Sequence, residues 1–275
     1  MKIETFQTKI QLTKNSRLPQ VNWNKLPFGK LFSDHMFTMD YSNGRWLDMS
    51  IVPYGNISLS PANSALHYGQ SCFEGMKAHR NINGSIALFR PFENAKRFNH
   101  SNKRMCIPEI NEELFVNAII ELLAIDHQWV PENLNHSLYI RPFIFATDPY
   151  IGIKPSENYK FMIFTCPVGA YYSDPVAVKI ETNFSRAVQG GTGSAKAAGN
   201  YAAALYPAML AAEEGFRQLI WTDAIEHKYI EEAGTMNVIF IIDNILVTPI
   251  SGDTILNGIT KKSVLEIAKD WGMEV

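Results

Sequence analysis

The feature that most constrains this chain is a lysine, Lys196, enclosed by glycine and alanine on both sides. The segment reads Gly190-Gly-Thr-Gly-Ser-Ala-Lys196-Ala-Ala-Gly-Asn-Tyr201. Glycines let the backbone turn tightly and let a flat ligand approach it closely. A lysine held among small residues can lose part of its hydration, which lowers the pKa of its amine and frees it as a nucleophile. The segment therefore favours a lysine that forms a Schiff base with a carbonyl group.

Two other interpretations of Lys196 exist. The ordinary one is an exposed loop lysine, because lysine is seldom buried. The other is a nucleotide-binding loop, but the phosphate-loop pattern requires glycine before the lysine and serine or threonine after it. Ala195 and Ala197 occupy those positions, and no G-x-G-x-x-G pattern is present in the segment. These residues alone leave a Schiff-base lysine and an ordinary loop lysine open.

Composition excludes several classes of partner. The chain has 275 residues, 46% of them hydrophobic, and a formal net charge of −2, which is typical of a globular protein of one large domain or two smaller ones. It contains no basic run for nucleic acid or an anionic membrane surface, and no apolar run near the roughly 18 residues of a membrane span. Three widely spaced cysteines, Cys72, Cys106 and Cys166, suit neither a metal site nor a disulfide framework. We expect a cytoplasmic protein without a metal.

Periodicity and turn residues predict a mixed chain. Apolar spacing, caps and prolines predict helices over residues 91–105, 111–124, 201–214 and 260–271, with Asn200 as the cap of the third and Pro207 bending it. Strands are expected over residues 137–147, 160–168, 176–182, 218–222, 238–242 and 245–248. Without regular alternation of strand and helix, the fold class is α+β, with mostly antiparallel sheets and flanking helices. We expect an N-terminal domain over residues 1–170, a linker near 171–175 and a C-terminal domain over 176–275.

Several short segments occur in an order typical of one known family. They are Ala65–Lys77, Leu88–Arg97, Tyr139–Pro142, Pro167–Tyr171, the lysine segment, Glu232–Asn237 and Leu256–Thr260. In these segments and their order, the chain resembles the branched-chain amino acid aminotransferases, which are pyridoxal-phosphate enzymes of fold type IV. The resemblance runs from about residue 25 to the end of the chain.

The resemblance implies a cofactor, pyridoxal 5′-phosphate, and a role for each matching residue. Lys196 would hold the cofactor aldehyde as a Schiff base and, once displaced, move a proton during catalysis. Glu232 would face the pyridine nitrogen and keep it protonated. Tyr201 would hydrogen-bond the phenolic oxygen. By sequence alone, Glu226, Glu231 and Glu232 could form a solvated acidic edge. The choice of Glu232 over Glu231 rests on the family likeness.

The remaining site residues also come from the resemblance. Arg97 would bind the phosphate, since the arginine fork matches phosphate oxygens. The N–H groups of Ile259 and Thr260 would assist it at a helix start, and Thr235 would complete the cofactor site. Arg141 would accept the side-chain carboxylate of glutamate. The substrate pocket would be aromatic, lined by Phe73, Tyr139 and Tyr171, with Tyr68 supplied by a second subunit.

The implied activity is reversible transfer of the amino group of leucine, isoleucine or valine to 2-oxoglutarate by a homodimer. The partners are then small amino and 2-oxo acids. Family members run several tens of residues further, so we expect an incomplete C-terminal domain here. Three alternatives stay open: a D-amino-acid aminotransferase, an aminodeoxychorismate lyase of the same fold, and a catalytically impaired fragment.

Overall fold

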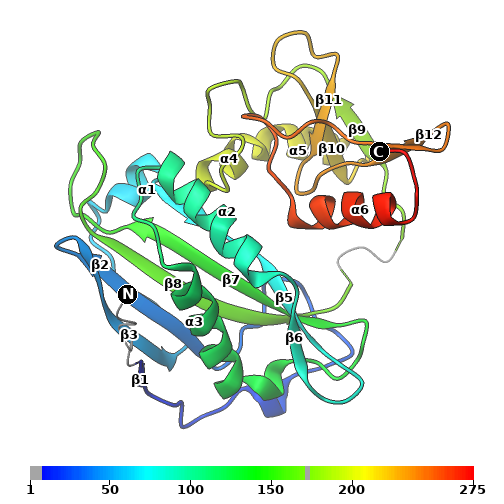
Figure 1. Cartoon of the computed structure of the whole chain (residues 1–275). Helices are drawn as coiled ribbons and strands as arrows, with labels where there is room; N and C mark the ends of the chain where they lie inside the picture. The colour runs from blue at the N-terminus through cyan, green and yellow to red at the C-terminus, as the bar shows by residue number, and fades with distance from the viewer. Residues whose placement is uncertain (1–7, 171–173) are drawn as a thin grey trace. The chain divides into compact units, whose positions relative to one another are not determined.

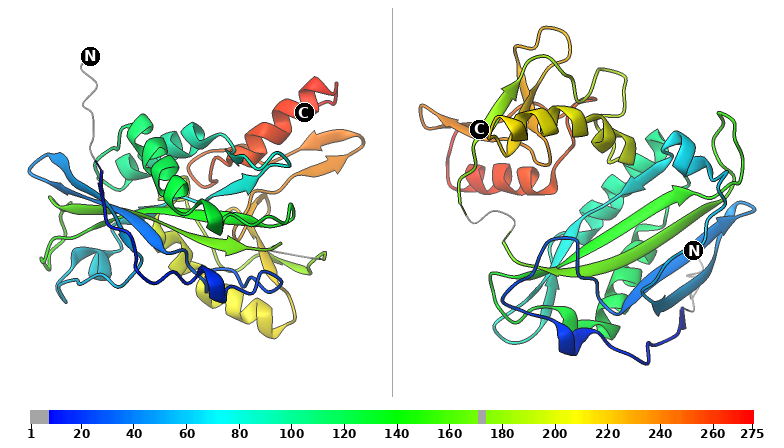
Figure 2. Two further views of the ribbon diagram at one scale, coloured as in Figure 1. Left: turned by 90° about the horizontal axis from the view of Figure 1, so that it is seen from below. Right: turned by 180° about the vertical axis from the view of Figure 1, so that it is seen from behind.

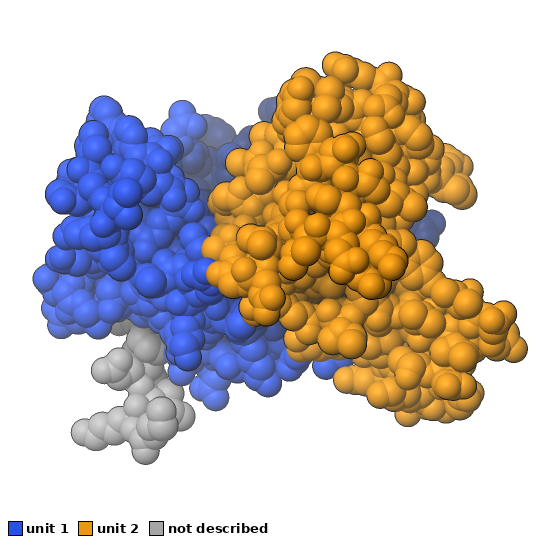
Figure 3. Space-filling view, turned by 90° about the horizontal axis from the view of Figure 1, so that it is seen from above, with its two compact units in different colours: residues 1–173 blue, residues 174–275 orange. Residues whose placement is uncertain are grey.

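The chain divides into two compact units, residues 1–173 and 174–275, coloured separately in Figure 3. The computed structural model describes residues 8–170 and 174–275. The division falls within the segment that the sequence predicts as a linker. Among the described residues, no helix combines the length and the apolar character that crossing a membrane requires.

The first unit is built on one large sheet with the strand order β1-β3-β2-β8-β7-β5-β6, in which β4 pairs with β7 (Figure 1). All its strand pairs are antiparallel except β1 with β3. The long strands β7 and β8 are nearly those that the sequence predicts. The strands are β1 (Lys9–Ile10), β2 (His35–Ser42), β3 (Arg45–Pro53), β4 (Ser71–Phe73), β5 (Met76–Arg80), β6 (Ile86–Leu88), β7 (Ser137–Ala146) and β8 (Tyr159–Val168).

Two helices, α2 (Pro91–Arg104) and α3 (Glu112–Ile125), lie on the same face of this sheet (Figure 2). As predicted, α2 begins at a proline, and Asn111 caps α3 by accepting a hydrogen bond from the Leu114 N–H. An aromatic core joins the helices to the sheet, because Phe98 and Phe115 contact each other and the Phe161 ring. The short helices are η1 (Leu18–Gln20), α1 (Ser64–Tyr68) and η2 (His127–Trp129).

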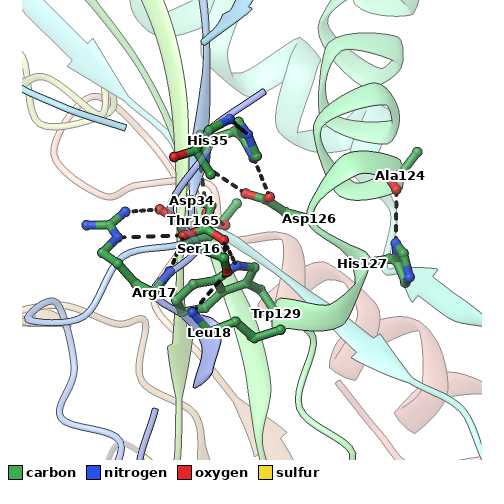
Figure 4. Close-up of polar contacts among 12 residues, drawn as sticks. Ser16, Arg17, Leu18, Asp34, His35, Ala124, Asp126, His127, Trp129 and Thr165 are labelled. Carbon is green, nitrogen blue, oxygen red and sulfur yellow. Dashed lines mark hydrogen bonds and ion pairs between the residues drawn. The ribbon is translucent and has the colours of Figure 1, made fainter. Parts of the chain in front are cut away.

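A buried polar network holds the start of β2 (Figure 4). Asp34 accepts hydrogen bonds from the Arg17 N–H at 2.9 Å and from the Trp129 indole at 3.1 Å. Next to it, the His35 Nδ1 lies 2.7 Å from the Asp126 carboxylate. Burial raises the pKa of Asp34, but these hydrogen bonds outweigh burial and hold its pKa below the usual range. The network therefore ties the N-terminal segment to the end of α3 and stabilises it while Asp34 is ionised.

The second unit contains a small sheet in the order β11-β10-β9, in which β9 and β10 are parallel. A separate hairpin, β12 with β13, turns at Asp243 and Asn244, which both have positive φ as the predicted two-residue turn requires. Ala211, Leu219 and Trp221 form a small hydrophobic cluster in the core of this unit. The strands are β9 (Val178–Glu181), β10 (Gln218–Thr222), β11 (Ile230–Ala233), β12 (Phe240–Ile242) and β13 (Ile245–Val247), and the helices are α4 (Ala198–Ala203), α5 (Leu205–Glu213) and α6 (Ile259–Asp270).

The prediction of one helix over residues 201–214 is wrong, because two helices, α4 and α5, meet at Ala204. Pro207 is the third residue of α5 and has no N–H to continue the hydrogen bonding of α4, so the helix breaks instead of bending. Asn200 is likewise not a cap. It lies inside α4, whose N-cap is Ala197. The predicted buried strand over residues 238–242 is also shorter and more exposed than expected, with Ile241 68% exposed.

Candidate functional site

The second unit brings Lys196 and Tyr201 into direct contact. The Lys196 amine donates a hydrogen bond of 2.9 Å to the Tyr201 hydroxyl. Lys196 directly precedes the N-cap of α4, and Tyr201 lies on that helix, so a spacing of five residues places both side chains together. The alanines on either side of the lysine are buried. The small residues therefore pack inward while the amine and the phenol meet.

Asn200 holds the glycine-rich loop in place. Its amide donates to the carbonyls of Thr192 at 2.7 Å and Ala195 at 2.9 Å, and the Thr192 hydroxyl donates back at 2.6 Å. Gly193 is needed for space, since a Cβ there would lie 2.5 Å from the Cβ of Ala187 and 2.8 Å from the Asp253 carbonyl oxygen. The loop before Lys196 is thus fixed by close backbone packing and by one amide side chain.

Glu232 is a buried carboxylate of this unit, as is Glu181 on β9. Glu232 lies on β11 and is 5% exposed. Its Oε1 lies 2.9 Å from the Arg186 guanidinium, and its Oε2 accepts hydrogen bonds from the Asn237 amide at 3.0 Å and the Leu256 N–H at 3.2 Å. Burial raises the pKa of Glu232 to about 6, with Arg186, the Leu256 N–H and Lys196 opposing the rise. Glu232 is therefore buried, paired and within the electrostatic influence of Lys196.

Glu231 has different surroundings from Glu232. Its Oε1 accepts a hydrogen bond of 2.6 Å from the Thr254 hydroxyl, and no cation is paired with it in the described part of the chain. The Asn237 amide that binds Glu232 also donates to the Leu256 carbonyl at 2.8 Å. A Cβ at Gly258 would collide with the Asn237 side chain. Asn237 therefore joins β11 to the segment that leads into α6.

The predicted cofactor-binding residues Ile259 and Thr260 are the first two residues of α6, behind the N-cap Gly258. The first N–H groups of a helix have no acceptor within it and favour an anion. Thr235 follows β11, is exposed, and accepts a long hydrogen bond of 3.5 Å from Gln218. The placement of Ile259 and Thr260 suits a phosphate, whereas the role of Thr235 stays a prediction.

The first unit brings together three of the predicted substrate residues. Phe73 lies on β4, and Tyr139 and Arg141 lie on the neighbouring strand β7. The Arg141 guanidinium lies 4.4 Å from the centre of the Phe73 ring and donates to the Tyr139 hydroxyl at 3.0 Å. A Cβ at Gly75 would collide with the Tyr139 ring. These contacts form an aromatic wall with one cation against it.

Arg97 belongs to a second buried pair, on α2. It donates from Nε to the Glu74 Oε1 at 2.7 Å and from Nη2 to Oε2 at 2.9 Å. Glu74 is 0% exposed and also accepts from the Asn94 amide at 2.8 Å. Two parallel hydrogen bonds fix the plane of the guanidinium. Arg97, the residue predicted to bind the phosphate, is therefore oriented by a buried carboxylate.

The two remaining predicted substrate residues are Tyr68 and Tyr171. Tyr68 ends α1 and is 43% exposed, and Tyr171 lies outside the described residues. Sequence reasoning named no role for Glu74 or Asn237, although both stand inside the family segments. Arg186 lies outside those segments, and only its position shortly before the lysine loop could have drawn attention to it.

The donor set of the second unit fits pyridoxal 5′-phosphate. An amine, a phenol and a paired carboxylate match its aldehyde, its phenolic oxygen and its pyridine nitrogen. The first turn of α6 adds N–H groups that suit a phosphate. Within residues 8–170 and 174–275, no group of three or more His, Cys, Asp or Glu side chains could hold a metal ion.

Comparisons with known proteins agree on one family. The family model for amino-transferase class IV matches residues 71–275. Branched-chain-amino-acid aminotransferase 2 of Bacillus subtilis is 47% identical over 98% of this chain and 76% of its own length. A crystal structure of the Escherichia coli branched-chain amino acid aminotransferase superposes with a TM-score of 0.72 at 27% identity, over 88% of this chain and 76% of that one. A T.th. branched-chain amino acid aminotransferase with pyridoxamine 5′-phosphate gives a TM-score of 0.70 at 30% identity, over 86% and 75%.

Proposed function

We propose a reaction for this chain from one premise, namely that it belongs to the class IV aminotransferase family. The reaction is reversible transfer of the amino group of L-leucine, L-isoleucine or L-valine to 2-oxoglutarate, with pyridoxal 5′-phosphate as cofactor. The family resemblance, the α+β fold and the aminotransferase class predicted from the sequence are confirmed. The cofactor is confirmed by the same family membership and by a related structure that holds its amino form.

The observation that carries the proposal is the contact between the Lys196 amine and the Tyr201 hydroxyl, in the same unit as the buried Glu232. When bound, the cofactor supplies a conjugated ring that accepts electrons from the substrate Cα. Lys196 would hold the aldehyde and, when free, would move the proton at the substrate Cα. Tyr201 orients the amine and would hydrogen-bond the phenolic oxygen. The Glu232 carboxylate would accept a hydrogen bond from the protonated pyridine nitrogen.

By family likeness, Arg97 is assigned to the phosphate. Glu74 fixes the Arg97 fork from behind. A neutral arginine–glutamate pair attracts an anion less than a lone arginine does, so the gain of this arrangement is orientation. In the second unit, Ile259 and Thr260 are assigned to the cofactor because the first turn of α6 favours an anion, and Thr235 is assigned to it by family likeness.

The substrate side chain is assigned to the aromatic wall of the first unit. Phe73 and Tyr139 offer apolar surface to a branched aliphatic group. Arg141, stacked on the Phe73 ring and hydrogen-bonded to Tyr139, offers a cation to the side-chain carboxylate of glutamate. The two halves of one pocket would thus serve leucine and glutamate in turn. Tyr171 is assigned to the same wall on the family likeness alone.

A cytoplasmic homodimer is the further part of the proposal. The exposed Tyr68 at the end of α1 would reach the site of a second copy. All three cysteines are free, which suits a reducing compartment. Sedimentation of the purified chain at several concentrations tests the dimer, and a monomer at all of them would contradict it.

The function is tested by adding pyridoxal 5′-phosphate to the purified chain and recording the visible absorption before and after L-leucine. We expect a band that L-leucine converts to the pyridoxamine form and that 2-oxoglutarate restores. Lys196→Ala should remove the band and lower turnover by about 10⁴-fold or more, because the nucleophile and the proton carrier are the same group. D-leucine distinguishes the D-amino-acid alternative. A band unchanged by L-leucine, or an active Lys196→Ala variant, would contradict the proposal.

A further inference from the structure

One guanidinium joins three segments of the second unit. Arg186 lies between β9 and the lysine loop, and its side chain is 9% exposed. Its Nη2 contacts the Glu232 carboxylate at 2.9 Å, the Gly193 carbonyl at 3.3 Å and the Thr254 carbonyl. Its Nε is buried and has no acceptor among the described residues. Arg186 therefore connects the glycine loop, β11 and the segment before α6 at one buried positive charge.

The charges that face Glu232 come from four residues. Arg186 and Lys196 act as cations on it, and Glu231 acts as an anion. Lys261 lies on α6 and is also influenced by Glu232. Lys261 is 5% exposed and donates to Ser251 at 2.6 Å and to the Pro249 carbonyl at 3.2 Å, and burial lowers its pKa. Arg186 is the cation in direct contact with the carboxylate.

The chemistry of the cations separates Arg186 from the two lysines. Lys196 is committed to the cofactor aldehyde under the proposed function, and a lysine can give up its proton when it is buried. Arginine keeps its charge at every pH at which a protein is folded. A buried carboxylate without a paired cation takes up a proton, because an isolated charge is too costly in a low-dielectric interior.

We propose that Arg186 is a positioning residue that keeps Glu232 ionised and oriented toward the pyridine nitrogen of the cofactor. The inference rests on the proposed function, because it assumes that Glu232 meets that nitrogen. Without Arg186, Glu232 takes up a proton and becomes a neutral acid. A neutral acid does not hold a second proton on the ring nitrogen, so the ring becomes a weaker electron acceptor. Arg186 thus acts on the reaction through Glu232 without touching the substrate.

The test uses three variants of Arg186 and one matched control. R186M removes the charge and the hydrogen bonds. R186Q removes the charge but keeps a polar amide, so its comparison with R186M separates loss of the charge from loss of a polar side chain. R186K restores one charge without the fork. R217M is the control, because Arg217 is an exposed arginine of the same unit, directly before β10.

The main readout is nitrogen NMR of cofactor labelled at the ring nitrogen, recorded between about pH 6 and 9, the range in which a one-unit pKa change is visible. In the wild-type holoenzyme and in R217M, we expect the ring nitrogen to stay protonated. In R186M and R186Q its pKa should fall by about one unit or more. R186K should lie between the two groups. The kcat for leucine should fall about tenfold with the KM little changed, since the substrate contacts remain.

The outcomes separate the inference from the function on which it rests. If R186M and R186Q keep the ring nitrogen protonated and only lower the melting temperature, Arg186 is merely structural and the inference is wrong. If the wild-type ring nitrogen is unprotonated and Glu232→Gln gives the same signal, Glu232 does not serve that nitrogen. The proposed role of Glu232 would then fail, and the inference with it.

Discussion

Among the residues that the structure describes, a buried arginine–glutamate pair occurs in each unit, and the two pairs are assigned opposite roles. In the first unit, Arg97 is the residue assigned to a ligand, and the fully buried Glu74 supports it from behind with both oxygens. In the second unit, Glu232 is the residue assigned to a ligand, and Arg186 supports it through one oxygen. The same kind of ion pair is thus assigned to present a cation in one unit and an anion in the other. In the first unit the carboxylate is the more buried partner, with the side chains of Glu74 0% and Arg97 13% exposed, whereas in the second unit both partners are buried, with the side chains of Glu232 7% and Arg186 9% exposed.

Removing the hidden carboxylate of the first pair should have the largest effect. Glu74→Ala removes the carboxylate that holds the Arg97 guanidinium, and breaking a buried pair in this way costs about 3–5 kcal/mol. Urea unfolding of the purified chain measures this loss. Glu157→Ala is the control, because the Glu157 side chain is 77% exposed and forms an exposed pair with Lys154, so its loss should stay below about 1 kcal/mol. Equal losses for the two variants would contradict the comparison.

The role of Glu232 in the second pair is tested by replacing Glu232 and its neighbour Glu231, one at a time, with glutamine. Glu232→Gln should lower kcat about 100-fold or more, because a neutral amide cannot keep the ring nitrogen protonated and such electrostatic contacts are worth about that factor. Glu231→Gln should change kcat by less than about fivefold, since Glu231 bonds Thr254 instead. An active Glu232→Gln enzyme beside an inactive Glu231→Gln enzyme would show that the two roles are reversed.

The pH dependence of the cofactor-free chain gives a third test. Burial raises the pKa of Glu232 from 4.5 to about 6, so the folded state binds a proton that the unfolded state has released. The protonated Glu232 therefore stabilises the folded state by about 2 kcal/mol. This stabilisation is fully present below about pH 4.5 and is lost as the pH rises through 6. The difference in unfolding free energy between wild type and Glu232→Gln should follow that curve. A difference independent of pH would contradict the raised pKa.

A smaller effect is expected where the second pair meets α6. Gly258→Ala places a Cβ against the Asn237 side chain, which holds the second oxygen of Glu232. Because Asn237 can shift, we expect a loss of about 1–2 kcal/mol, measured by thermal unfolding. Gly252→Ala is the control, since a Cβ there meets nothing within 4 Å. Equal melting temperatures for the two variants would show that Asn237 is not held in place.

Local spacing made part of this structure predictable. The helices over Pro91–Arg104 and Glu112–Ile125 follow from a proline, an asparagine cap and apolar periodicity. The Lys196–Tyr201 contact joins residues five positions apart across one helix start. By contrast, Arg186 is paired with Glu232, and Glu74 with Arg97, between elements far apart in sequence. No periodicity records such a pairing, because it depends on how the elements pack.

Pro207 is the sequence signal for the break between α4 and α5. The sequence predicts a bend in a single helix there, but a proline at the third position of α5 starts a new helix. Because α4 begins at Ala198, Asn200 lies inside this helix and does not cap it. Its amide then holds Thr192 and Ala195. The structural role of Asn200 in the lysine loop therefore depends on where α4 begins, and the sequence predicts that boundary three residues too late.

The opposite roles of the two arginines are tested most directly by the cofactor's phosphate. We would measure dissociation constants for pyridoxal 5′-phosphate and for pyridoxal in wild type, Arg97→Met and Arg186→Met. The account predicts that Arg97→Met lowers the preference for the phosphorylated form about tenfold or more, as expected for loss of a charge-assisted contact. Arg186→Met should keep that preference while changing the spectrum of the bound ring. An equal loss of preference in both variants would contradict the assignment of Arg97 to the phosphate and of Arg186 to Glu232.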